Sequence, residues 1–129
     1  SHQPDADLSG YYLPVGEPQV GDVALRHLFV AAEPDFADWE AGERRYPPVA
    51  LRLAGGRIVP TAYSVSEGRI RLEGRHDGLG AVEFDGRLDA DALAQARRAI
   101  GSRAVVLTGT LKAGGQTHSG LRFTWSSGE

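Results

Sequence analysis

The stretch of residues 69–85, RIRLEGRHDGLGAVEFD, carries the pattern that most constrains the fold of this chain. Apolar residues occupy every second position in two short runs, and charged residues stand between them, as in half-buried strands. The apolar positions are Ile70, Leu72, Val82 and Phe84. The pattern predicts two antiparallel strands joined by a tight turn.

A three-residue turn that ends at Gly78 would join these two strands, because a turn of this length needs a left-handed residue at its last position. This turn places Leu72 opposite Val82 on the apolar face. It also places Arg69 opposite Asp85 on the outer face, so that opposite charges meet. We therefore expect the arginines of this hairpin to pair within the sheet rather than to bind nucleic acid.

Alternating patterns recur along the chain and predict eight strands in all. Their ranges are 8–13, 23–31, 49–54, 57–65, 69–75, 79–88, 105–112 and 116–125. In the second of them, His27 shares a face with Val23, Leu25 and Phe29. Pro60 marks an edge or a bulge, because proline donates no ladder hydrogen bond.

The final hairpin is expected to turn at residues 113–115, which places Leu107 opposite Leu121. His118 then points outward. Gly109 falls opposite Ser119, a thin spot that predicts a bend.

Two helices interrupt the strands. Asp89 is a good N-cap for a helix between the sixth and seventh strands, and Leu93, Ala96 and Ile100 give that helix an apolar stripe. A short helix is expected in the connection between the second and third strands, with Pro34 in its first turn.

The fold class that follows is all-β: an eight-stranded antiparallel up-and-down barrel, closed because closure removes exposed edges. A two-sheet sandwich is the alternative. We expect residues 1–7 to be a flexible tether and residues 8–129 to form a single domain.

Composition limits the possible functions. The 129 residues include no Cys and carry a net charge of −3, which gives no thiolate chemistry, no disulfide and no electrostatic reason to bind nucleic acid. No apolar run approaches the ~20 residues of a transmembrane helix. The chain also lacks Met, which suggests processing or trimming, and export to the bacterial periplasm or envelope is slightly favoured over a cytoplasmic location. A signal segment with a lipid-attachment Cys would fit that location.

Gly10, Tyr11 and Tyr12 on the first strand and Arg122 on the last resemble, together with the strand count, the small lipocalin-like (calycin) barrels of bacteria. That family has Trp where Tyr12 stands, packed near a basic residue of the final strand, and places its helix after the eighth strand. The resemblance implies that a small apolar ligand binds within the barrel.

The candidate binding site lies at the connection between the second and third strands, which is long for a compact domain. Aromatic and basic residues gather there and could form a lid over the barrel mouth, with two further side chains beneath it. The expected ligand-binding residues are His27, Phe36, Trp39, Arg44, Tyr46 and Tyr63. Equally, Trp39 could simply plug the barrel as core.

Two functions follow from these features. The first is a non-enzymatic protein that binds a small apolar or amphipathic ligand inside the barrel. The alternative is an envelope interaction module, such as an inhibitor or immunity-type protein, with a filled barrel and an exposed aromatic–arginine surface. No catalytic residues, metal ligands or cofactor are expected, because the four histidines match no metal spacing and no nucleophile motif is present.

Overall fold

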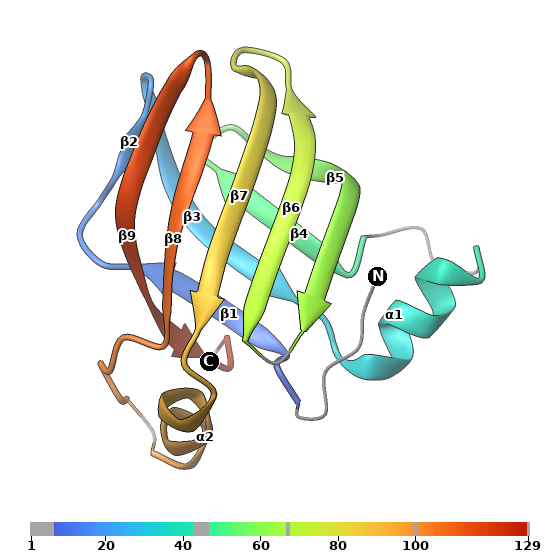
Figure 1. Cartoon of the computed structure of the whole chain (residues 1–129), viewed down its shortest axis with the longest axis vertical. Helices are drawn as coiled ribbons and strands as arrows, with labels where there is room; N and C mark the ends of the chain where they lie inside the picture. The colour runs from blue at the N-terminus through green and yellow to red at the C-terminus, as the bar shows by residue number, and fades with distance from the viewer. Residues whose placement is uncertain (1–6, 43–46, 67, 100, 129) are drawn as a thin grey trace.

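The computed structural model describes residues 7–42, 47–66, 68–99 and 101–128, which form a barrel with two helices at one end (Figure 1). The elements of this part of the chain are β1 (Gly10–Pro14), β2 (Gln19–Val20), β3 (Val23–Val30), α1 (Glu33–Glu40), β4 (Val49–Leu53), β5 (Gly56–Ser66), β6 (Arg69–His76), β7 (Gly80–Leu88), α2 (Ala90–Arg98), β8 (Leu107–Ala113) and β9 (Gln116–Ser126).

The predicted closed barrel of eight antiparallel strands is confirmed. Strands β3 to β9 pair with their neighbours in chain order, and β1 pairs with both β3 and β9. The short β2 adds only to the start of β3. The sheet therefore closes on itself, and the sandwich alternative does not apply.

The predicted register of the β6–β7 hairpin was wrong by one position on each strand. Leu72 lies opposite Phe84, not Val82, because the turn spans residues 77–79. His76 holds this turn by accepting hydrogen bonds at Nδ1 from the backbone N–H groups of Gly78 (3.1 Å) and of the residue after it (3.2 Å). The left-handed glycine is Gly80, with φ of 75°, rather than Gly78.

The expected charge pair survives this shift. Arg69 makes two hydrogen bonds to the Asp85 carboxylate, at 2.9 and 2.6 Å, although its direct partner across the ladder is Arg87. Long side chains reach diagonal neighbours on a sheet face, so the contact does not depend on direct opposition.

Pro60 does mark a bulge, since the register of β5 against β6 shifts between Pro60 and Ala62. Beyond the bulge, Tyr63 lies opposite Leu72 and Val65 opposite Ile70, as their spacing requires.

The β8–β9 hairpin differs from the prediction. Leu107 lies opposite Phe123 and Gly109 opposite Leu121, because the turn has only two residues, Gly114 and Gly115, and a bulge follows in β9. Both turn glycines have positive φ, 59° and 76°, which suits a two-residue hairpin turn.

Large side chains fill the barrel interior. Phe84 is 1% exposed, and its ring packs edge-on against Phe123 with 5.6 Å between centroids. The same ring covers two glycines: a Cβ added at Gly86 or Gly109 would meet it within 2.9 Å and 2.7 Å, respectively. No polar or charged residue of the described part belongs to the buried core.

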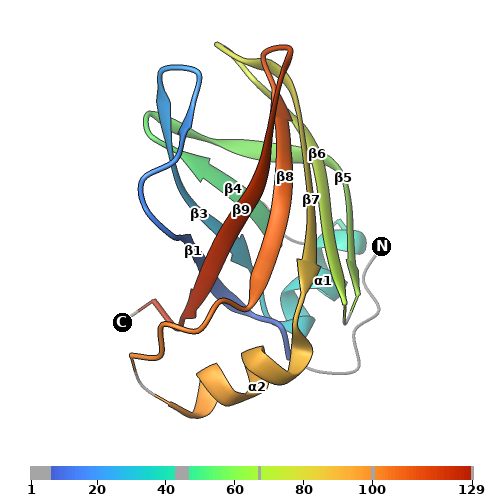
Figure 2. The same ribbon diagram turned by 60° about the vertical axis from the view of Figure 1, so that its left-hand side comes forward.

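Both helices lie at the same end of the barrel (Figures 1 and 2). Asp89 caps α2 as predicted, accepting from the N–H of Ala92 at 3.0 Å, and the buried residues of α2 are Leu93 and Ala96; Ile100 lies outside the described residues. Helix α1 begins with Pro34 in its first turn, and Gly42, with φ of 78°, follows its last residues.

A polar network holds α2 against the strands. Arg97 stacks on the Trp125 ring, 4.8 Å from its centroid, and donates to the Ser9 carbonyl at 2.6 Å. It also pairs with Asp7 at 2.7 Å, so this last residue of the expected tether is held by the barrel. Tyr12 lies beneath, fully buried, and donates its hydroxyl to the Leu8 carbonyl.

Leu79 closes the other end of the barrel. Its carbonyl accepts from the N–H of Gly114 at 3.1 Å, and its side chain lies 3.3 Å from a Cβ built on Gly21. The tips of the β2–β3, β6–β7 and β8–β9 hairpins therefore meet at Leu79.

Candidate functional site

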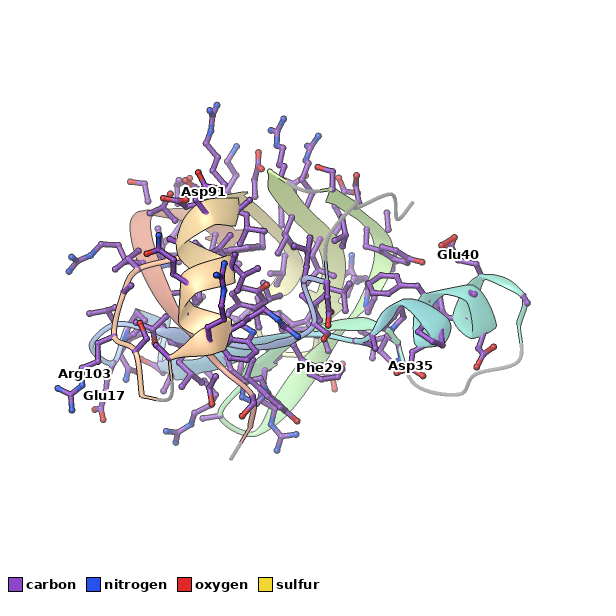
Figure 3. All side chains as sticks on the ribbon, turned by 90° about the horizontal axis from the view of Figure 1, so that it is seen from below. Glu17, Phe29, Asp35, Glu40, Asp91 and Arg103 are labelled. Carbon is purple, nitrogen blue, oxygen red and sulfur yellow. The ribbon has the colours of Figure 1, made fainter. Side chains whose placement is uncertain are left out.

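The structure brings together two of the six residues predicted to bind a ligand. Phe36 of α1 is 1% exposed and packs against Tyr63 of β5, with 5.6 Å between ring centroids. Burial raises the pKa of Tyr63 to about 12, helped by the charge of the Glu40 carboxylate and a hydrogen bond to it. In Figure 3, α1 lies to one side of the barrel end, with Glu40 on it. The contact between Phe36 and Tyr63 therefore packs α1 against strand β5 of the barrel.

The other predicted residues do not complete a site around this pair. Trp39 lies on the same helix and is partly exposed. Arg44 and Tyr46 lie outside the described residues, so their predicted role remains a prediction. His27 lies on β3, away from this pair.

His27 lies on the outer face of the barrel, not on the inward face with Leu25. The pairing of β3 with β4 shifts between these two residues, and His27 lies opposite the exposed Arg52. The inward side chains beyond the bulge are instead Leu28 and Val30, both buried. An extra residue in a strand reverses the faces that follow it, which explains the wrong prediction.

On the outer face, His27 belongs to an aromatic cluster. The Tyr11 ring lies 5.0 Å from His27, nearly perpendicular to it, and 5.1 Å from Phe29 (centroid distances). Farther along β1 and just after it, Leu13 and Val15 are 39% and 43% exposed. We call these five residues, Tyr11, Leu13, Val15, His27 and Phe29, the β1 patch.

Burial within this cluster lowers the pKa of His27, and the positive charge of Arg52 lowers it further. Both causes favour the neutral imidazole. The β1 patch is therefore apolar in character, with arginines Arg26 and Arg52 exposed beside His27 on neighbouring positions.

Two hollows flank the β1 patch, and Leu13 lines both. One, of about 410 Å³, lies between α2 and β9 and is lined by Arg97, Ser102 and Trp125 among others. The second, of about 380 Å³, lies at the chain reversal after β1 and includes Arg26. Leu13 thus lies between the two hollows, and a complementary protein surface could pack around its side chain.

A third hollow, of about 530 Å³, runs over the outer face of β6, β7 and β8. Charged side chains line it: Glu73 faces Glu83 directly, and Lys112 faces Glu83 from β8. The side chains that line it carry charges of both signs and are mainly solvated, so this hollow indicates a binding site less clearly than the β1 patch does.

His118 faces inward, contrary to the prediction, because the bulge in β9 places it opposite the buried Leu111. Its Nε2 atom is buried and accepts or donates no hydrogen bond among the described residues.

The part of the chain that the structure describes contains no group of three or more His, Asp or Glu side chains arranged to hold a metal ion. Nor does any of its helices have the length and apolar character needed to cross a membrane.

The basic residue that the calycin resemblance pairs with Tyr12 is not there. Arg122 is exposed on the outer face, opposite Thr108, while the guanidinium near this end of the barrel is that of Arg97. Trp125, not an arginine, lies opposite Tyr12. The likeness therefore extends to the barrel architecture and not to this motif.

Comparison with known proteins identifies no relative. No family model matches the chain, and neither the curated proteins nor the solved structures include a similar one. The class that the fold defines is a closed eight-stranded antiparallel β-barrel.

Proposed function

We propose that this protein is a non-enzymatic interaction module that binds another protein through the β1 patch. The observation that carries this proposal is the placement of apolar side chains. Two of the three large hydrophobic residues exposed in the described chain, Leu13 and Val15, belong to this one patch. Exposed apolar groups that gather with aromatic rings and arginines are typical of protein interfaces.

The packed interior supports this function over a ligand held within the barrel. A small apolar ligand would have to displace side chains such as Phe84 and Phe123, whose rings already pack against each other and over two glycines. An interaction module needs its barrel only as a rigid support for the outer residues. A location in the bacterial envelope fits this proposal and remains a prediction from the sequence.

The test is affinity capture with a matched control. The variant L13D/V15D places carboxylates in the β1 patch, and V59D places one at the third exposed hydrophobic residue, on β5. Wild-type protein and V59D should recover the same partner from an extract of the source organism, and L13D/V15D should lose it, with circular dichroism showing all three folded.

A partner that binds L13D/V15D as well as it binds the wild type would refute the proposal. A ligand-binding barrel would behave differently again. Its melting temperature would rise when a medium-chain fatty acid is added, and the rise would be the same in both variants.

A further inference from the structure

Charged residues are distributed unevenly over the strands of this barrel. The sequences of β1, β3, β4, β8 and β9 contain no Asp or Glu, although the chain as a whole carries a net charge of −3. The cations of these five strands are Arg26, Arg52, Lys112 and Arg122. Among the strands that the structure describes, acidic residues occur only in β6 and β7, where arginines lie between them. The wall around β1 is therefore basic, whereas the wall around β6 and β7 is mixed in sign.

Three of these cations flank the β1 patch. On one side, Arg26 and Arg52 are exposed, and Arg52 lies directly opposite His27 in the β3–β4 ladder. On the other side, Arg122 is exposed, and its backbone carbonyl accepts a hydrogen bond from the N–H of Val15 at 2.8 Å. Figure 2 shows β3, β1 and β9 side by side, so the patch has a strand that carries a cation on each side.

The three arginines around the patch have no carboxylate partner. Arg69, by contrast, binds both carboxylate oxygens of Asp85 on the far wall. None of the three forms an ion pair with another residue in the described part of the chain. Glu17, in the loop after β1, lines the same hollow as Arg26 and offsets part of its charge. The remaining positive charge is available to a partner.

The shape of the β1 patch favours a protein over a lipid bilayer as that partner. Leu13 lies between hollows of about 410 and 380 Å³, which the side chains of a protein can enter. Binding to a membrane surface strengthens with the apolar area that is buried, and Leu13 and Val15 offer little of it. A protein surface that is acidic around an apolar side chain matches both the charge and the relief of the patch.

We propose that the partner protein presents an acidic surface around one apolar side chain, which packs beside Leu13. The carboxylates of the partner pair with Arg26, Arg52 and Arg122. This inference rests on the proposed function and deepens it, because the apolar side chains of the patch do not by themselves define the charge of the partner. Complementary charge speeds the association of the correct partner and rejects partners of the same sign.

The experiment uses two synthetic peptides that share a central leucine–tryptophan pair, flanked by glutamates in one peptide and by lysines in the other. Each peptide is titrated into isotope-labelled full-length protein, and the amide chemical shifts are recorded. The glutamate peptide should shift the amides of Leu13, His27 and Phe29, with an affinity that falls as salt is added. The lysine peptide should bind more weakly, because the arginines repel it.

The variant R26Q/R52Q/R122Q removes the three cations beside the patch. An exposed ion pair contributes about 1.4- to 5-fold to an affinity, so this variant should bind the glutamate peptide at least about 3-fold more weakly than the wild type. It should also bind the two peptides with similar affinity, and circular dichroism should show it folded.

The matched control is R71Q/R75Q/R87Q, which removes the same amount of charge from β6 and β7, where all three arginines are exposed. Charges on the far wall are screened from the patch by salt, so this control should bind the glutamate peptide nearly as the wild type does.

Equal affinity of the two triple variants for the glutamate peptide would overturn the acidic partner. If both peptides shift the β1 patch with the same affinity, the patch binds apolar groups whatever their charge; the proposed function then stands and this inference fails. Phosphatidylglycerol vesicles are the comparison for a membrane. If the vesicles broaden the amide signals of the patch and the glutamate peptide leaves them unchanged, the basic wall binds an anionic bilayer, against the proposal.

Discussion

Replacing Gly109 with alanine tests the packing on which the functional argument depends. A Cβ at this position would lie 2.7 Å and 2.8 Å from ring carbons of Phe84 and 3.1 Å from the Asp85 carbonyl oxygen. Contacts this short force a neighbour to move. Phe84 has little freedom to do so, because it is 1% exposed and packed against Phe123.

The expected magnitude follows from two opposing effects. Overpacking a well-filled core costs about 1–3 kcal/mol. Alanine also reduces the conformational entropy of the unfolded chain, which offsets about 0.4–1 kcal/mol, since Gly109 does not adopt a positive φ. With the middle of each range, G109A should lower the free energy of unfolding by roughly 1.3 kcal/mol.

Urea denaturation measures this change, with two further variants to identify its cause. In a Phe84→Leu background the shorter side chain leaves room, so G109A should cost less than half as much. Gly68→Ala is the control, because nothing lies within 4 Å of a Cβ there, and it should change stability little. If G109A and wild type unfold at the same urea concentration, the barrel interior has unfilled space beside Phe84. A ligand inside the barrel then becomes the better hypothesis.

Two further predictions concern pH. Since burial and Arg52 lower the pKa of His27, its imidazole should titrate in NMR spectra below the ~6.5 of an ordinary histidine. The contribution of His27 to folding stability is present above pH ~6.5 and is lost as the pH falls through the pKa of the folded state. His27→Gln should therefore make the free energy of unfolding less dependent on pH over this range. Partial burial would raise the pKa of Asp7, but the hydrogen bonds from Ser9 and the charge of Arg97 lower it overall. Asp7→Asn should therefore cost up to about 1 kcal/mol at neutral pH in urea unfolding, and nothing at pH values acidic enough to protonate Asp7.

The sequence predicts the strands and helices of this fold well, because each depends on local patterns. Alternating apolar residues identify the strands, and Asp89 identifies the start of α2. Pairing registers were less predictable, since they depend on turn length and bulges. Both misplaced registers follow from a turn that differs from the expected one, at residues 77–79 and at residues 114–115.

The candidate site was harder to predict than the fold for a related physical reason. A single bulge in β3 carries His27 from the predicted interior to the outer face. No residue type near it signals the bulge, so the alternation of Leu25, His27 and Phe29 suggested one continuous face. The exposed Leu13 was equally hard to recognise, because a strand with apolar residues on both faces normally indicates a covered strand.

The presence of apolar residues on both faces of β1 also bears on function. A β1 strand with apolar residues on both faces needs something over its outer face. The described chain supplies only part of that cover, in His27, Phe29 and the backbone of Gly128 against Tyr11. Beyond Tyr11, the outer side chains Leu13 and Val15 remain exposed. A partner bound to the β1 patch would cover these side chains, whereas a ligand inside the barrel would leave them exposed.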